Sequence, residues 1–228
     1  MQILCEDYDT VIVPTPLFTM FFTEWWVRAR VAIVGAVTKA EDDFDITIEC
    51  LEGAFQESVK NGKVPKALVL IQPNNPTGKL YPKETLLRCI EWAKGKGIHV
   101  ISDEIYAITI FEDYDMLSMA RVVHDEIEQI KDSSEQKDKE HIHYLTNYTH
   151  IVGGFSKDFC VNGLRTGIIY SKNAEVLEAL AGFLLFVHNY MSNNSAFLLQ
   201  KMLEDTTWLD NFVNTTRRRL TLQFNALK

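Results

Sequence analysis

The hydrophobic positions of this chain follow two patterns that alternate along its length. Short continuous apolar runs rich in β-branched residues are typical of strands that are buried on both faces. Between them, apolar residues recur at the spacing of amphipathic helices. The runs predict strands at residues 10–13, 31–37, 67–71, 99–102, 149–152 and 166–170. The spaced patterns predict helices at residues 18–26, 47–60, 84–94, 116–130, 174–187, 195–203 and from 208 to the end.

The order of these elements predicts the fold class. Strand–helix–strand units favour a parallel sheet with right-handed crossovers, so we expect an α/β fold with a mostly parallel sheet and helices on both faces. Pro14 is expected to end the first strand, because proline cannot donate to a sheet. Residues 131–140 are nearly all charged or polar and predict a solvated, poorly ordered loop, and residues 217–219, three arginines, predict a solvated helix face.

Composition restricts the classes of partner. The 228 residues are 46% hydrophobic and 24% charged, as in an ordinary globular protein, and the formal net charge of −8 argues against a nucleic-acid binder. No apolar run reaches membrane-spanning length, so no membrane partner is expected. The four cysteines are far apart, which predicts reduced thiols and a cytoplasmic location, and no metal site is expected.

Four loops of unusual composition each follow a predicted strand. They are residues 14–18, 72–78, 103–106 and 156–165. Ligands of parallel α/β sheets bind at the carboxyl ends of the strands, so the side chains of these loops are expected to converge on one crevice.

Lys157 lies in the last of these loops, just past the apolar pair Ile151 and Val152 and between glycines. A lysine at a strand end is most often an ordinary side chain that extends its ammonium to water. A buried lysine would instead lose its proton more readily and become a nucleophile. The other three loops favour the second interpretation, because a phosphorylated pyridine aldehyde would use every group that the four loops supply.

Short motifs within these loops occur in one order along the chain. They are Pro-Thr-Pro-Leu-Phe at 14–18, Asn-Pro-Thr-Gly at 75–78, Ser-Asp-Glu-Ile-Tyr at 102–106, and Ser-Lys-Asp at 156–158 with Gly-Leu-Arg-Thr-Gly at 163–167. With these motifs the chain resembles fold-type I pyridoxal-phosphate enzymes of the class I/II aminotransferase superfamily. Within that superfamily it is most similar to 1-aminocyclopropane-1-carboxylate (ACC) synthases and ACC-synthase-like proteins.

The resemblance implies that pyridoxal 5'-phosphate is the cofactor and gives seven residues a role in its site. Lys157 would form the Schiff base and later act as the general base, and Ser156 precedes it in the motif. Asp103 would keep the pyridine nitrogen protonated. The remaining roles are ring-hydroxyl donors for Asn75 and Tyr106, the phosphate clamp for Arg165 and the stacking ring for Phe18.

The chain departs from the family's pattern in several places. Gly154 stands where a phosphate-binding serine is common, and Phe18 stands where a tyrosine is common. The resemblance also implies that residues 1–205 are a large cofactor-binding domain without its N-terminal part, including the glycine-rich phosphate loop. Residues 206–228 would be a helix leading to a small C-terminal domain, which carries the arginine that binds the substrate carboxylate. On this view the 228 residues alone would be inactive, and the apolar residues 183–186 would be exposed.

Several alternatives stay open for the function. The resemblance implies a homodimer that acts on an amino acid or an S-adenosylmethionine-like substrate, as an aminotransferase or an ACC synthase. A carbon–sulfur lyase on the same scaffold is a second candidate. A truncated, non-catalytic relative that serves as an interaction module is the third.

Overall fold

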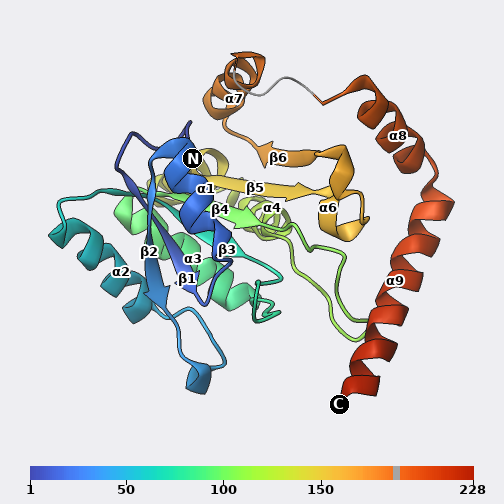
Figure 1. Cartoon of the computed structure of the whole chain (residues 1–228). Coiled ribbons are helices and arrows are strands. Elements are labelled where there is room, and N and C mark those ends of the chain that lie inside the picture. Colours follow the sequence, from blue (N-terminus) through green and yellow to red (C-terminus); the bar gives the residue numbers. More distant parts are fainter. Residues whose placement is uncertain (187–190) are drawn as a thin grey trace.

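A computed structural model describes residues 1–186 and 191–228, and these form one sheet with helices on both faces (Figure 1). Its six strands, taken over the described residues, have the order β2-β1-β3-β4-β5-β6. The strands are β1 (Thr10–Thr15), β2 (Ala32–Val37), β3 (Pro65–Ile71), β4 (His99–Asp103), β5 (Thr149–Gly154) and β6 (Gly167–Ser171). The helices are α1 (Met20–Ala29), α2 (Ile48–Lys60), α3 (Lys83–Lys96), α4 (Met119–Ile130), α5 (Gln136–Tyr148), α6 (Phe155–Asp158), α7 (Ala174–Phe186), α8 (Asn193–Glu204) and α9 (Thr206–Leu227).

The alternation of side chains along the central strands divides the apolar residues between two cores. Ile12, Leu68 and Val100 face one side, where they pack with buried residues of α2, α3, α4 and α5. Their chain neighbours Val11 and Val69 face the other side, which α1 covers (Figure 1). Both faces are therefore buried at the centre of the sheet, which explains why these strands read as continuous apolar runs.

Helix ends follow local capping chemistry. The Thr47 hydroxyl oxygen accepts a hydrogen bond from the Cys50 N–H at 3.2 Å and begins α2, and Ser118 and Ser192 begin α4 and α8 in the same way. At the other end of α3, Gly97 adopts a left-handed conformation with φ 67°.

The mostly parallel α/β fold is confirmed, with β6 paired to β5 in the antiparallel direction. One local prediction is wrong. Pro14 does not end β1, which continues to Thr15 and pairs there with β2. The pairing of β1 with β3 stops at Ile12, so the missing N–H of Pro14 leaves no gap in that ladder.

The predicted loop at residues 131–140 is wrong for its second half, although eight of the ten residues are exposed as expected. Only a short turn follows α4, and α5 begins at Gln136. Its amphipathic face inserts Tyr144 and Leu145 into the core, and the Tyr144 hydroxyl donates to the Ile98 carbonyl at 2.6 Å. The anchoring residues lie downstream of the charged stretch, so the composition of that stretch alone did not reveal the helix.

The C-terminal helices stand apart from the sheet, and α9 runs along one side of the molecule (Figure 1). In the predicted apolar patch, Leu185 is exposed, while Phe183 and Leu184 are partly buried. The side chain of Phe186 and residue 187 lie outside the described residues. Across residues 1–186 and 191–228, no helix has both the length and the hydrophobicity needed to cross a bilayer.

Two histidines at the amino-terminal edge of the sheet contact each other. His99 Nδ1 lies 2.9 Å from His150 Nε2, and His150 Nδ1 lies 2.8 Å from the Ser171 hydroxyl. Burial, with the charge of His99 as a second cause, lowers the pKa of His150 to about 4. Burial also lowers the pKa of His99.

This pair is expected to make the protein less stable in mild acid. The unfolded imidazoles take up protons near their ordinary pKa of about 6.5, before the folded ones do. Stability should therefore fall as pH drops from about 6.5 to 4, by up to about 3 kcal/mol for His150. Urea unfolding between pH 7.5 and 4 measures it. His150→Phe should flatten the slope, and the exposed His124→Gln should not; equal slopes in all three proteins would contradict the assignment.

Candidate functional site

The loops that follow β1, β3, β4 and β5 meet at the carboxyl edge of the sheet. Hydrogen bonds connect them in pairs: Asn74 Nδ2 to the Pro16 carbonyl at 3.5 Å, Gln72 N–H to the Asp103 carbonyl at 2.9 Å, and Glu104 N–H to the Val152 carbonyl at 2.8 Å. Because β6 is antiparallel, Arg165 at its amino end lies at this same edge. The predicted convergence of the four loops is therefore present.

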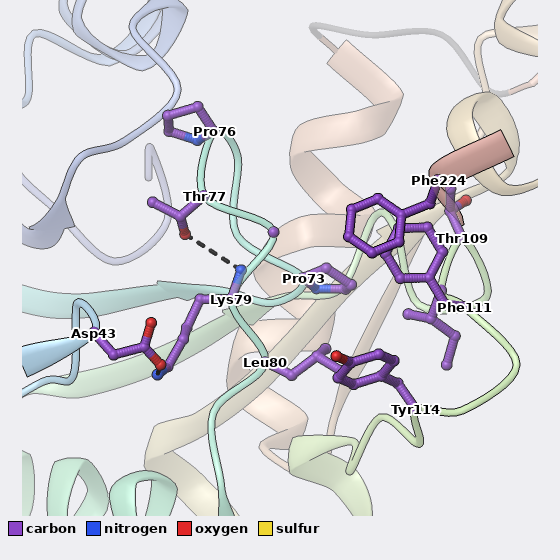
Figure 2. Close-up of a pocket in the computed structure, with 12 residues that line it drawn as sticks. Asp43, Pro73, Pro76, Thr77, Lys79, Leu80, Thr109, Phe111, Tyr114 and Phe224 are labelled. Atoms are coloured by element: carbon purple, nitrogen blue, oxygen red, sulfur yellow. Dashed lines mark hydrogen bonds and ion pairs between the residues drawn. The ribbon is translucent and has the colours of Figure 1, made fainter. Parts of the chain in front are cut away.

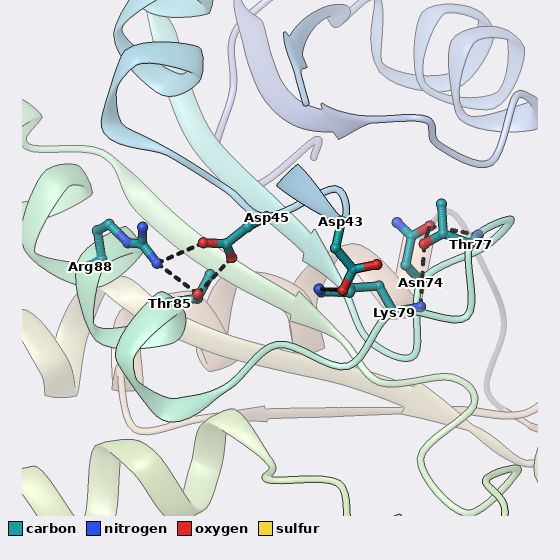
Figure 3. A network of polar contacts seen from close by, with 7 residues as sticks. All are labelled: Asp43, Asp45, Asn74, Thr77, Lys79, Thr85 and Arg88. Carbon is teal, nitrogen blue, oxygen red and sulfur yellow. Dashed lines mark hydrogen bonds and ion pairs between the residues drawn. The ribbon is translucent and has the colours of Figure 1, made fainter. Parts of the chain in front are cut away.

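Asn74 organises the turn after β3 (Figure 3). Its side-chain oxygen accepts hydrogen bonds from the Thr77 N–H at 3.1 Å and the Thr77 hydroxyl at 2.8 Å. Its backbone carbonyl accepts from Gly78, whose φ of 71° suits glycine. Lys79 closes the turn by an ion pair with Asp43. These contacts fix the backbone on both sides of Asn75.

Three of the predicted site residues lie at or just after the ends of β3 and β4, and two of them are in contact. Asn75 Nδ2 donates to the Tyr106 hydroxyl at 3.4 Å. Asp103 ends β4 and accepts a hydrogen bond from the Ile105 N–H at 3.2 Å. Burial raises the pKa of Asp103 to about 6, the Ile105 N–H lowers it, and the negative charge of Glu104 raises it further.

The other four predicted residues are less constrained. Lys157 lies on α6 with its side chain exposed, so the burial argument for its nucleophilicity does not hold in this structure. Ser156 precedes it and is partly buried. The Arg165 guanidinium donates to the Asn162 carbonyl at 3.0 Å, and Phe18 packs edge-on against Phe21, with ring centroids 5.5 Å apart.

Comparison with known proteins identifies the family. The family described as "Aminotransferase class I and II" matches residues 1–228. The chain belongs to this family. It is 32% identical over 220 residues to 1-aminocyclopropane-1-carboxylate synthase 2 of Arabidopsis thaliana, covering 96% of this chain and 41% of that protein. It is 30% identical over 214 residues to "Probable inactive 1-aminocyclopropane-1-carboxylate synthase-like protein 2" of Mus musculus, covering 91% of this chain and 34% of that protein.

Solved structures of the family agree with the fold. The Thermus thermophilus aspartate aminotransferase double mutant 1 superposes with a TM-score of 0.75 and 25% identity, over 95% of this chain and 48% of that one. The aromatic aminotransferase of Pyrococcus horikoshii OT3 gives a TM-score of 0.74. The chain thus spans half or less of the length of these relatives.

The residues present fit the pyridoxal phosphate that the family implies. One edge of the sheet carries an amine, a guanidinium, a carboxylate, an amide and a phenol, which is the donor set for an aldehyde, a phosphate, a pyridine nitrogen and a ring hydroxyl. Gly154 is closely packed at this edge: an added Cβ would lie 3.1 Å from the Thr166 carbonyl oxygen and 3.0 Å from Ile105 Cδ1.

This close packing predicts the effect of a serine at position 154, where the family resemblance makes serine common. Gly154→Ser is expected to lower stability by about 1–3 kcal/mol, because the backbone carbonyl of Thr166 at the start of β6 cannot move aside as a flexible side chain can. Thermal unfolding measures the change. Gly163→Ser is the matched control, since a Cβ there meets nothing within 4 Å. A Gly154→Ser protein as stable as this control would contradict the prediction and show that the backbone at Thr166 can shift to accommodate the side chain.

Two buried carboxylates in the site were quoted within motifs but given no role from the sequence. Glu104 accepts hydrogen bonds from the Ser102 hydroxyl at 2.9 Å and the Met119 N–H at 2.8 Å, so it joins β4 to the start of α4. Asp158 accepts from the Ile108 N–H and the Thr109 hydroxyl. The sequence feature that could have revealed them is a carboxylate next to a predicted site residue, at a strand or loop end where burial is expected.

A pocket of about 590 Å³ lies beside this edge, between the turn after β3, the segment 109–114 and Phe224 of α9 (Figure 2). Phe111, Tyr114, Leu80 and Phe224 supply most of its apolar wall. None of the seven predicted site residues lines it, so this pocket is not the predicted cofactor position.

Proposed function

We propose that this chain is the cofactor-binding part of a pyridoxal-phosphate-dependent enzyme that processes amino acids, as an aminotransferase or an ACC-synthase-like protein. The single observation that supports this most is the hydrogen bond between Asn75 and Tyr106 at the sheet edge that also carries Asp103, Lys157 and Arg165, within a family match over residues 1–228. The named relatives with about 30% identity include ACC synthases.

When bound, the cofactor would supply a protonated pyridine ring that withdraws electrons from the bond to the substrate α-proton. Asp103 would accept a hydrogen bond from the ring nitrogen and hold the proton there. Asn75 and Tyr106 would orient the ring by donating to its hydroxyl, and Phe18 would cover one face. Arg165, whose guanidinium donates one hydrogen bond to the Asn162 carbonyl, would pair with the phosphate through its other N–H groups. Lys157 Nζ would hold the cofactor at its aldehyde, and the same amine would take the α-proton of the substrate.

Charge placement favours this use of Asp103. Its carboxyl has a pKa of about 6 without a cationic partner, because burial penalises the ionised form. A protonated ring nitrogen would provide the missing positive charge and hold the carboxylate ionised at neutral pH. The surroundings of Asp103 therefore favour a cationic group next to its carboxylate.

Covalent labelling tests the proposal. Pyridoxal phosphate followed by borohydride is expected to label the peptide that contains Lys157, and the Lys157→Ala protein should lose that label. The exposed Lys172 is a matched control, because it lies at the opposite end of β6 and its replacement should leave the labelling unchanged. Labelling spread evenly over many lysines, with none enriched at Lys157, would overturn the site.

The reaction outcome, the substrate and the assembly are part of the proposal. Transamination of an amino acid, ring closure on an S-adenosylmethionine-like substrate and elimination of a β-substituent by a carbon–sulfur lyase share the same first proton transfer. We propose a homodimer in a reducing compartment such as the cytoplasm, in line with four free cysteines. Product assays with each substrate class, and the mass of the purified protein in solution, test these points.

A non-catalytic role is the second candidate, and one observation favours it. A relative at 30% identity carries "Probable inactive" in its name. Against it, the residues that would bind the aldehyde, the ring and the phosphate are present: Lys157, Asp103, Asn75, Tyr106 and Arg165. Labelling of Lys157 without turnover of any substrate class would favour this candidate.

A further inference from the structure

Asp158 is a buried carboxylate that connects two parts of the candidate site. It ends α6, directly after Lys157, and is 7% exposed. Its Oδ1 atom accepts hydrogen bonds from the Thr109 hydroxyl at 2.7 Å and from the Ile108 N–H at 3.2 Å. The residues that it contacts come from the segment that follows Tyr106.

That segment is compact, so a contact at its end also fixes its start. The Ala107 N–H donates to the Glu104 carbonyl and the Thr109 N–H donates to the Tyr106 carbonyl, both at 3.0 Å. Tyr106 in turn accepts from Asn75. A continuous set of hydrogen bonds therefore leads from α6 to the two predicted ring-hydroxyl donors.

The side chains around Asp158 are mostly apolar and do not call for a charged residue at this position. Together with Ile108, Phe155 and Phe159 it lines an almost wholly apolar pocket of about 380 Å³. Burial raises the pKa of Asp158, which means that the ionised carboxylate is costly there. A side chain that only filled this space would be apolar. Because burying a carboxylate costs free energy, its two hydrogen bonds to Thr109 and Ile108 indicate that Asp158 fixes the position of α6 relative to that segment.

We propose that Asp158 is a positioning residue that holds Lys157 at a fixed place relative to Tyr106 and Asn75. The proposal rests on the proposed function, because it concerns where the Lys157 amine meets the cofactor aldehyde. Asp158 itself touches neither; it acts through the backbone of α6 and of the segment 106–109.

Four variants separate positioning from simple structural support. Asp158→Leu removes both acceptors and the charge, and Asp158→Asn keeps an oxygen at Oδ1 without the charge. Thr109→Val removes the hydroxyl donor, and Thr109→Ser restores it. Asp125→Asn is the matched control, since Asp125 also accepts two hydrogen bonds, both from Arg121, but on an exposed face of α4.

Two readouts are taken at a temperature where every variant is folded. The first is hydrogen–deuterium exchange of residues 106–109 without cofactor. The second is the fraction of pyridoxal phosphate that borohydride fixes on Lys157 rather than on other lysines. Loss of a hydrogen bond to a charged acceptor changes an equilibrium by roughly tenfold. We therefore expect about tenfold faster exchange and a similar loss of Lys157 selectivity in Thr109→Val and Asp158→Leu, with recovery in Thr109→Ser and Asp158→Asn.

The outcomes distinguish the two proposals. If the unsubstituted protein labels Lys157 and Thr109→Val labels it with equal selectivity, Asp158 is only a structural contact and the positioning role is overturned. If the unsubstituted protein never labels Lys157, the proposed function fails and the positioning role fails with it, whatever the exchange rates. If Asp158→Leu does not fold, the Thr109 pair and Asp158→Asn still decide the question.

Discussion

The Asp103→Asn protein is expected to unfold at a higher temperature than the unsubstituted protein when no cofactor is present at pH 8. Burial raises the pKa of Asp103 to about 6, so at pH 8 the carboxylate is ionised in surroundings that disfavour its charge. A shift of about two pKa units corresponds to about 3 kcal/mol at most. Replacing the carboxylate by a neutral amide should recover part of that free energy, and in a chain of this length each kcal/mol raises the melting temperature by roughly 2–4 °C.

The pH dependence identifies the cause. A folded-state pKa above the ordinary value means that the folded protein holds a proton between about pH 4 and pH 6 that the unfolded chain releases. The contribution of Asp103 to stability is thus fully present below pH 4 and is lost as pH rises through 6. The advantage of Asp103→Asn should therefore be large at pH 8 and small at pH 4. Asp210→Asn, at an exposed position of α9, should show no such difference.

The Asp103→Asn substitution should lower the rate of catalysis although it raises stability. In any form of the protein that exchanges the substrate α-proton, Asp103→Asn should slow that exchange by several orders of magnitude, because the amide cannot hold the ring nitrogen protonated. The loss of the α-proton signal in D₂O measures the rate. A variant that is more stable when empty and nearly inactive when loaded would mark Asp103 as retained for function at a cost to stability. Near-normal exchange would contradict its role.

The sequence was sufficient for the parts of the fold that depend on continuous burial. Strands such as Ala67 to Ile71 are covered on both sides, and their apolar runs predicted them within a residue or two. The direction of a strand is harder to predict than its position. Nothing in the residues of β6 distinguishes antiparallel from parallel pairing with β5, because the short connection after α6 decides that direction. Pro14 was misjudged because its tolerance depends on where β1 separates from β3, which is a property of the sheet.

In the candidate site too, some features could be predicted from local sequence and others depend on the folded structure. Motifs placed Asn75, Asp103 and Tyr106 at or after strand ends, and the parallel sheet brings these ends to one edge, where Asn75 contacts Tyr106. The exposure of Lys157 and the two hydrogen bonds to Asp158 depend on how α6 leaves β5 and meets the segment after Tyr106. Contacts between positions about 50 residues apart leave no periodic pattern in a single sequence, so no reading of local composition reveals them.

Arg217 makes the clearest contacts between distant positions of the chain. It was predicted to lie on a solvated helix face, and that is correct for Arg218 and Arg219, which are exposed. The Arg217 guanidinium instead donates to the carbonyl oxygens of Phe111, Glu112 and Tyr114, and it forms an ion pair with Asp115 at 3.6 Å. This one side chain therefore joins α9 to the loop that continues from Thr109.

Two further contacts accompany it. The Thr221 hydroxyl accepts from the Glu112 N–H at 2.9 Å, and Phe224 stacks on Phe111 with ring centroids 4.5 Å apart. Among the described residues, neither core includes a residue of α9, which runs along one side of the molecule in Figure 1, so few other contacts hold its C-terminal half in place. Removing Arg217 should therefore release that half of the helix locally and leave the sheet folded.

Arg217→Ala is expected to cost about 2–4 kcal/mol of local stability, since it leaves three carbonyl oxygens without their charged donor. Hydrogen exchange in residues 212–227 and in the segment 111–115 should increase by roughly two orders of magnitude, while exchange in β3 and β4 should not change. Arg218→Ala changes the same side chain one position away, where the structure shows it exposed, and serves as the control. Equal exchange in the two variants would mean that Phe224 and Thr221 hold α9 without help from Arg217. A difference confined to these two segments would identify Arg217 as the residue that couples α9 to the loop after Tyr106.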